Sequence, residues 1–356
     1  MSQYVFLQVK EVIRETADAV TIVFTKPTVI TTYKSGQFLT LIITIAGEKL
    51  RRSYSLSSSP YADEDWAVSV KKIQGGKMST HIVDHVKAGD IIETMAPIGV
   101  FVYEPSASNT NDIVLIGGGS GITPLVSVIS SALKVEQKSK VYLIYSNRNE
   151  DAVMLREKLE NIKANYAERF NYVNVYSKPL QPVSGISGRL DKTKLVQLLE
   201  NFKSINFAKA HFFVCGPSGM MDEAFQALDK LNVSQDNIRK ENFTAAVHHP
   251  SEEVTSETLA VVTSIGAVVV DIKYSKKTYK VNVAPGQTIL EAALNQNIDL
   301  PYSCQSGMCT ACIGKCKSGQ VKMDDPDGLS ENEIKQGFVL ICVGKPLTAD
   351  VLIEID

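Results

Sequence analysis

The pattern of apolar and polar residues changes twice along the 356-residue chain and divides it into three segments. In residues 1–104, apolar and polar residues alternate in short runs that glycine-containing turns separate. Alternation with a period of two predicts half-buried strands, and many short strands predict an antiparallel β-barrel or sandwich. We expect strands at 5–10, 19–25, 38–45, 54–57 and 67–72, and one short helix from residue 78 to about residue 86.

The second segment begins after a polar loop at residues 105–111 and runs from 111 to 243. Apolar runs at 112–116, 141–145, 172–176 and 211–214 alternate with helical patterns that begin near residues 124, 152, 190 and 217, the second covering 152–162. Alternation of strands and helices predicts an α/β domain with a parallel sheet and helices on both faces.

The third segment starts with a polar stretch at 244–258, which contains three Glu and one Pro and is typical of a linker. Residues 259–356 then carry β-rich runs at 261–272 and 278–283 and a helical pattern at 289–295. We therefore expect a multidomain chain that ends in a small α+β domain.

Composition excludes several classes of protein. The net charge is −2, and without a basic stripe there is no reason to expect nucleic acid as a partner. No run of 18 apolar residues is present and the N-terminus lacks the layout of a signal peptide, so we expect neither membrane insertion nor secretion. The six cysteines are not arranged as a disulfide framework, which favours the reducing cytoplasm.

Four of these cysteines carry the strongest chemical signal: Cys304, Cys309, Cys312 and Cys342. The spacing C-x4-C-x2-C with a distant fourth cysteine is that of a plant-type [2Fe–2S] ferredoxin. Small residues between the first three allow backbone N–H groups to approach the sulfurs, which tunes such a cluster. A structural zinc site is the alternative, but zinc sites usually pair two short cysteine knuckles, whereas Cys342 stands alone.

In the first segment, a possible phosphate and ring site begins at Arg52. Its guanidinium can pair with a phosphate, while Tyr54 can lie against a flat ring and the hydroxyl of Ser55 can bond to it. Further on, Gly76 precedes a predicted helix N-terminus, where free N–H groups attract a diphosphate. An ordinary strand followed by a capped helix is the alternative interpretation.

Two glycine turns in the second segment predict a dinucleotide site. The sequence GGGSGITP at 117–124 follows an apolar strand and opens a helix, and CGP at 215–217 follows another. Glycines let the backbone approach a diphosphate, and proline is tolerated in the first helical turn. For Cys215, a small buried core residue is the competing interpretation.

The end of the predicted strand 141–145 bears on the choice of coenzyme. Arg148 lies where an adenosine 2′-phosphate would bind, and no acidic residue is present there to hold a free 2′-hydroxyl. We therefore favour NADPH over NADH, with a solvated arginine as the alternative.

Together these motifs resemble the ferredoxin–NADP reductase superfamily, in particular the oxygenase reductases with a C-terminal [2Fe–2S] domain. The resemblance implies an FAD-binding β-barrel (1–104), an NAD(P)-binding domain (111–243), a linker (244–258) and a plant-type ferredoxin domain (259–356). It also favours FAD over FMN, and it places Phe243, in a Glu-x-Phe motif, near the flavin. The implied catalytic residues are Tyr54, Ser55 and Cys215. The implied cofactor-binding residues are Arg52, Ser53, Tyr54, Ser55, Val70, Lys71, Gly76, Met78, Ser79, Thr80, Gly118, Gly119, Ser120, Gly121, Thr123, Ser146, Arg148, Cys215, Gly216, Pro217 and Phe243.

The three sites together predict a redox relay. NADPH gives up two electrons as a hydride, a cluster takes one at a time, and a flavin can connect the two. The resemblance implies an oxygenase as the electron acceptor, with phenylacetyl-CoA epoxidase first and a Rieske-type hydroxylase second. A general flavodoxin or ferredoxin reductase and a zinc-bearing nucleotide-binding regulator are further alternatives.

Overall fold

The computed structural model describes residues 4–28, 32–182, 185–243, 267–305, 307, 309–324, 326 and 328–355. The chain divides into two compact units, residues 1–243 and 244–356. The linker expected at 244–258 and the first part of the strand expected at 261–272 lie outside the described residues.

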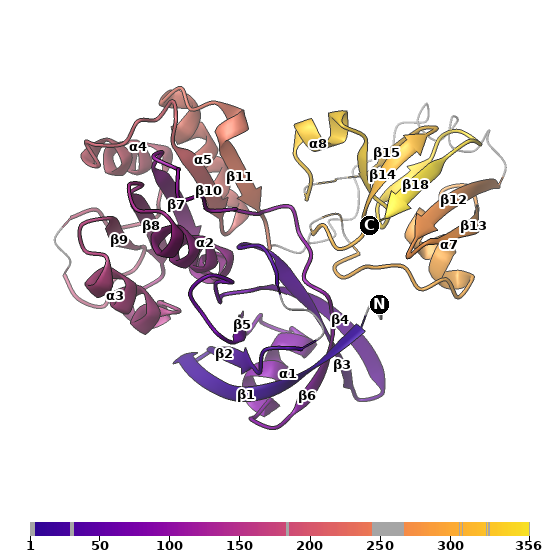
Figure 1. Cartoon of the computed structure of the whole chain (residues 1–356), viewed down its shortest axis with the longest axis horizontal. Coiled ribbons are helices and arrows are strands. Elements are labelled where there is room, and N and C mark those ends of the chain that lie inside the picture. The colour runs from indigo at the N-terminus through magenta and orange to yellow at the C-terminus, as the bar shows by residue number, and fades with distance from the viewer. Residues whose placement is uncertain are drawn as a thin grey trace. The chain divides into compact units, whose positions relative to one another are not determined.

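The N-terminal part of the first unit is an antiparallel six-stranded half-barrel, as the alternation predicts (Figure 1). Its strands follow the order β4-β3-β6-β1-β2-β5. Inward-facing aliphatic side chains form its core, and helix α1 adds Ile82 and Val83 to that core. The elements are β1 (Tyr4–Thr16), β2 (Ala19–Phe24), β3 (Phe38–Ile45), β4 (Glu48–Ser55), β5 (Trp66–Lys71), α1 (Lys77–His85) and β6 (Ile91–Met95).

The rest of the first unit is a five-stranded parallel sheet of order β11-β10-β7-β8-β9. Helices α2 and α3 pack on one face and α4 and α5 on the other, which gives two separate apolar cores (Figure 1). The fold class predicted for this segment is therefore confirmed. The elements are β7 (Ile113–Gly118), η1 (Gly119–Gly121), α2 (Ile122–Val135), β8 (Val141–Asn147), η2 (Glu150–Ala152), α3 (Arg156–Asn165), β9 (Phe170–Tyr176), α4 (Lys192–Asn201), β10 (His211–Cys215), α5 (Ser218–Lys230), η3 (Gln235–Asn237) and β11 (Ile238–Glu241).

The helix expected at 152–162 was wrong at both ends, because it begins at Arg156 and ends at Asn165. Leu155 adopts a left-handed conformation with φ of 56°, which interrupts the helical turn before Arg156. Its side chain is buried, and its N–H donates to Glu15 of the half-barrel over 2.8 Å. Because of this tertiary contact, the helix begins later in the chain than the local sequence indicates.

The second unit is a mixed five-stranded sheet of order β13-β12-β18-β14-β16, beside a two-stranded ladder. The helix expected at 289–295 is α7, whose N-cap Thr288 accepts a bond from the N–H of Glu291. The elements are β12 (Val268–Tyr274), β13 (Lys277–Val283), α7 (Ile289–Asn295), β14 (Ile313–Ser318), β15 (Val321–Met323), α8 (Glu331–Lys335), β16 (Phe338–Leu340), β17 (Gly344–Pro346) and β18 (Leu352–Ile355). Within the described ranges, no helix is long and apolar enough to cross a membrane.

Candidate functional site

The two glycine turns predicted to bind a dinucleotide lie side by side at the carboxyl edge of the parallel sheet. Strands β7 and β10 are neighbours, with Gly117 opposite Cys215. A Cβ atom on Gly121 would lie 2.2 Å from the carbonyl oxygen of Cys215, and one on Gly216 would lie 3.0 Å from the amide nitrogen of Gly118. Only glycine permits this close approach, and the side of the turns that bears no side chain suits a diphosphate.

The turn after β7 leads directly into helix α2, so the positive end of the helix dipole lies at the same edge. The hydroxyl of Thr123 donates to the carbonyl of Ser120 over 3.1 Å and closes the turn. Gly119 has a φ of +53° that favours glycine. Backbone N–H groups, rather than the hydroxyl of Thr123, are therefore the groups suited to hold phosphate oxygens here.

Strand β8 ends at this edge with a partly exposed Ser146 and an exposed Arg148. The N–H of Lys178 donates to the carbonyl of Arg148 over 2.7 Å, so a second cationic residue follows the neighbouring strand β9. Sequence reasoning missed Lys178, although its place shortly after a predicted strand could have indicated it.

On the half-barrel, the expected flavin residues lie at the end of strand β4. Arg52 is exposed, and its guanidinium donates locally to the carbonyl of Arg51 over 2.7 Å. Tyr54 packs partly against the half-barrel core, and burial raises the pKa of its hydroxyl. Ser53 is within 3.4 Å of Thr40 on strand β3.

Ser55 connects the half-barrel to the parallel sheet. Its hydroxyl donates to Glu241, at the end of β11, over 3.2 Å. Burial raises the pKa of Glu241 to about 8, whereas the bond from Ser55 acts in the opposite direction. Glu241 is therefore protonated at neutral pH, and sequence reasoning had named it only as part of a short motif.

Cys215 lies beside Glu241 in the parallel register between β10 and β11. Burial, followed by the nearby charge of Glu241, raises the pKa of the Cys215 thiol well above its ordinary value. A neutral, fully buried thiol is a poor nucleophile, which favours the interpretation of Cys215 as a small buried core residue.

At the start of α1, not every predicted flavin-site residue has a side chain that is available to a ligand. Met78 is buried in the half-barrel core. The hydroxyl of Ser79 accepts a bond from the N–H of Ile73 over 3.1 Å. Gly76 is the N-cap and there is no side-chain capping bond, so the first backbone N–H groups of α1 are available to an anion.

The remaining residues of the predicted flavin site lie in several different environments. The side chain of Val70 is buried in the half-barrel core, while Lys71 forms an ion pair with Asp18 over 3.5 Å. Thr80 is exposed, and Phe243 is 39% exposed at the end of the described part of the first unit.

In the second unit, hydrogen bonds connect the four cysteines of the predicted cluster to one another. The N–H of Cys309 donates to the sulfur of Cys304 over 3.4 Å. A hydrogen bond with Cys304 and then burial raise the pKa of Cys309, and hydrogen bonds with Cys304 and Cys312 raise that of Cys342. The backbone of Gly307 bonds to Cys342, so amides approach the sulfurs as expected for a [2Fe–2S] site.

Comparisons with known families agree with this arrangement. Residues 5–103 match the oxidoreductase FAD-binding domain, residues 115–226 the oxidoreductase NAD-binding domain, and residues 272–347 the 2Fe-2S iron-sulfur cluster binding domain.

Individual relatives match the chain from end to end. One of the subunits of 1,2-phenylacetyl-CoA epoxidase from Escherichia coli (strain K12) is 35% identical over 362 residues, which cover 100% of this chain and 99% of that protein. The ferredoxin reductase component of 3-ketosteroid-9-alpha-monooxygenase from Rhodococcus rhodochrous is 32% identical, with 99% and 97% covered. The structure of phthalate dioxygenase reductase superposes with a TM-score of 0.59 at 19% identity, covers 99% of this chain and 98% of that chain, and supports the fold.

The fold and the three matched domains define a modular NAD(P)H-dependent oxidoreductase. The chain belongs to the ferredoxin–NADP reductase superfamily, in the group that carries a [2Fe–2S] domain after the nucleotide-binding domain. The predicted FAD, iron–sulfur and nicotinamide cofactors are thereby confirmed, and a redox partner protein is the acceptor that its relatives indicate.

Proposed function

We propose that this protein is the reductase of a phenylacetyl-CoA epoxidase and carries electrons from NADPH to the oxygenase. Similarity over the whole chain to one of the subunits of that enzyme in Escherichia coli supports the choice of partner. The observation that carries the chemistry is the bond between Ser55 and Glu241, because it brings the expected flavin strand to the edge where the nucleotide turns meet.

A bound FAD would supply the chemistry that connects a two-electron hydride donor to a one-electron centre. The chain's own residues supply binding and orientation. Arg52 and the first N–H groups of α1 would hold the flavin phosphates, Tyr54 would lie against the ring, and Ser55 would bond to its edge. The four cysteines would hold the iron atoms of the cluster.

Glu241 supplies a group that can hold a proton beside this edge. With a pKa of about 8, its carboxyl is neutral at pH 7. One of its oxygens accepts a hydrogen bond from the hydroxyl of Ser55. A neutral carboxyl avoids placing a buried negative charge where electron-rich groups must bind.

The preference for NADPH depends on the end of β8. Arg148 is exposed there and Lys178 is close in the backbone, so two cations can meet a 2′-phosphate. A second candidate acceptor is a Rieske-type hydroxylase. The similarity to reductase components of another monooxygenase supports keeping this alternative.

Reconstitution tests the proposal. The purified protein, loaded with FAD, iron and sulfide, is mixed with the catalytic subunits of a phenylacetyl-CoA epoxidase, and NADPH-dependent conversion of phenylacetyl-CoA is measured by mass spectrometry. We expect turnover with NADPH. Absence of product, while the protein still reduces ferricyanide with NADPH, would reject the epoxidase as partner and leave the reductase activity in place.

A further inference from the structure

Beside an apolar cluster that includes Ala19 and Phe101, helix α2 also contacts the half-barrel through buried hydroxyl groups. Five serines form this contact, and their residues are at most 1% exposed. We call them the serine seam: Ser35, Ser58 and Ser59 from the half-barrel, and Ser127 and Ser131 from α2.

The hydrogen bonds of the seam have defined directions. The Ser131 hydroxyl donates to the carbonyl of Ser127 over 2.8 Å, so it must accept from Ser35 at 2.5 Å and from Ser59 at 2.7 Å. The Ser127 hydroxyl donates to the carbonyl of Ser58 over 2.6 Å. Because each hydroxyl has one proton, this arrangement fixes every donor and acceptor around Ser131.

The seam is only a few residues from both halves of the redox site. Ser58 and Ser59 follow Ser55 on the same chain segment, and α2 begins directly after the glycine turn at Gly121. A shift of α2 on the half-barrel would therefore move the dinucleotide turn relative to the flavin strand.

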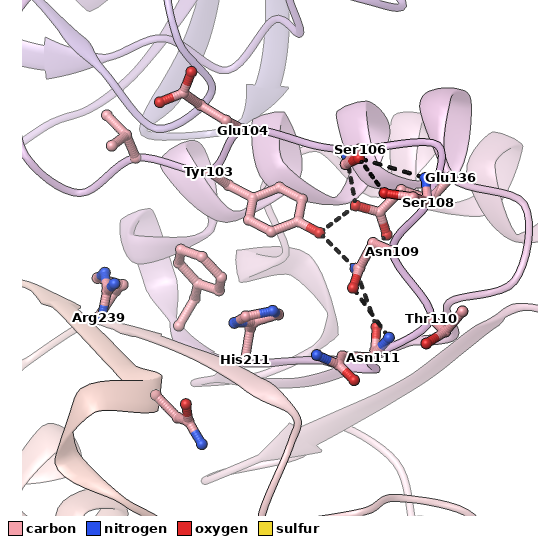
Figure 2. Close-up of a pocket in the computed structure, with 13 residues that line it drawn as sticks. Tyr103, Glu104, Ser106, Ser108, Asn109, Thr110, Asn111, Glu136, His211 and Arg239 are labelled. Carbon is pink, nitrogen blue, oxygen red and sulfur yellow. Dashed lines mark hydrogen bonds between the residues drawn. The ribbon is translucent and has the colours of Figure 1, made fainter.

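Two neighbouring features bear on how the seam contributes to this placement. A cleft of about 870 Å³ lies beside it, between the half-barrel and α3, and Ser58 lines that cleft. The apolar packing of Ala19 and Phe101 with α2 is therefore interrupted at the seam. At the other end of α2, Glu136 accepts bonds from Tyr103, Ser106, Asn109 and Ser139. Figure 2 shows that Glu136 bonds to the segment that connects the half-barrel to the parallel sheet within the first unit. This contact lies at the wall of a pocket of about 530 Å³.

We propose that Ser131 is a positioning residue for hydride transfer, which sets the distance between the nicotinamide and the flavin through the serine seam. Hydride transfer requires the reacting atoms at about 3–3.5 Å, and a displacement of about 1 Å can cost about a hundredfold in rate. The proposal depends on the family's transfer of a hydride from coenzyme to flavin and not on the identity of the oxygenase.

The test compares Ser131→Ala with Ser130→Ala. Ser130 is the adjacent residue on the same helix, is 6% exposed, and has no hydrogen-bond partner for its hydroxyl among the described residues. Both variants, loaded with FAD and cluster, are mixed anaerobically with NADPH in a stopped-flow instrument. Flavin bleaching, the long-wavelength charge-transfer absorbance and the dissociation constant of NADP⁺ are recorded per bound flavin.

For Ser131→Ala we expect the limiting rate of flavin bleaching to fall about tenfold or more, with weaker charge-transfer absorbance. The dissociation constant of NADP⁺ should change by less than about threefold, since the binding groups remain in place. Ser130→Ala should stay within about twofold of the unmodified protein in all three measurements. A wild-type bleaching rate in Ser131→Ala, or an equal loss in Ser130→Ala, would overturn the proposal.

A double variant separates positioning from stability. Ser131→Ala leaves the donors of Ser35 and Ser59 without their acceptor, which lowers the melting temperature. Adding Ser35→Ala removes one of these orphan donors, so part of the stability should return while bleaching stays slow. Recovery of the rate together with stability would show a structural role only. If Ser131→Ala does not load flavin, the single variant Ser35→Ala is tested by the same measurements. Slow flavin bleaching in that variant would support the proposal, and an unchanged rate would overturn it.

Discussion

The cysteine site of the second unit is built differently from the redox edge of the first unit. By redox edge we mean the carboxyl edge of the parallel sheet together with the end of strand β4. Three of the four expected cluster ligands are Cys304, Cys309 and Cys312, so the spacing alone indicates the chemistry. The edge in the first unit assembles strand ends and turns from β4, β7, β8, β10 and β11, which are far apart in sequence. Short motifs therefore reveal ligands, whereas an edge of this kind becomes recognisable only when the sheet order is known.

The two sites should also respond differently to substitution. A cluster needs its full set of thiolates, and loss of one ligand removes most of its stability. The edge offers backbone amides, a half-buried carboxyl and exposed cations, so single losses should be graded.

The largest effect should come from Cys309→Ser. We expect loss of the cluster's visible absorption and paramagnetic signal, while NADPH still bleaches the flavin, because the two sites have separate ligands. Cys316→Ser is the matched control, since this thiol bonds to the carbonyl of Ser318 on β14. Intact cluster bands in Cys309→Ser would show that this residue is not a ligand.

Gly121→Ala tests the close approach of the glycine turns. Its Cβ would lie 2.2 Å from the carbonyl oxygen of Cys215, so β7 and β10 must separate at the dinucleotide edge. We expect flavin reduction by NADPH to slow by about a hundredfold, with a stability loss of about 1–3 kcal/mol.

The control is Gly219→Ala, within helix α5, where an added Cβ meets nothing within 4 Å. Alanine there should be neutral or slightly stabilising. Rapid flavin reduction in Gly121→Ala would mean that the turn does not bind the coenzyme.

Much of this architecture follows from the sequence. Helix α7 has the expected bounds, and the alternation of strands and helices identified the parallel sheet. The cysteine spacing indicated a cluster rather than zinc, and the matched family domain agrees. These features depend on local periodicity and ligand spacing, which a single sequence contains.

The remaining features depend on contacts between distant segments. The start of α3 is set by the bond from Leu155 to Glu15. The environment of Glu241 depends on its bond from Ser55, many residues earlier in the chain. No local pattern encodes either pairing, because a carboxyl at a strand end is ordinarily solvated.

A smaller effect should distinguish the two coenzymes. For Arg148→Ala we expect the Michaelis constant for NADPH to rise about tenfold, the equivalent of about 1.4 kcal/mol from one phosphate contact. The constant for NADH should change by less than about twofold, because NADH lacks the 2′-phosphate. Arg239→Ala, at the amino end of β11, controls for a general loss of positive charge. An equal rise for both coenzymes would refute the assignment of Arg148 to the 2′-phosphate.

The smallest effect should appear in the pH dependence of stability, where the graded behaviour of the edge is most direct. The pKa of Glu241 is raised from an ordinary value of 4.5 to about 8, so the folded protein keeps a proton that the unfolded chain releases. Its contribution to stability is fully present below pH 4.5 and is lost as the pH rises to about 8. Gln at this position does not titrate. As the pH rises from 4.5 to about 8, the melting temperature of Glu241→Gln should therefore increase relative to that of the unmodified protein. Because Glu241 is partly exposed, we expect a gain of about 1 kcal/mol, or about 2–4 °C. A difference that stays constant between pH 5 and pH 9 would mean that Glu241 is ionised throughout, and would remove the proton-holding group from this edge while leaving the glycine turns and the cluster untouched.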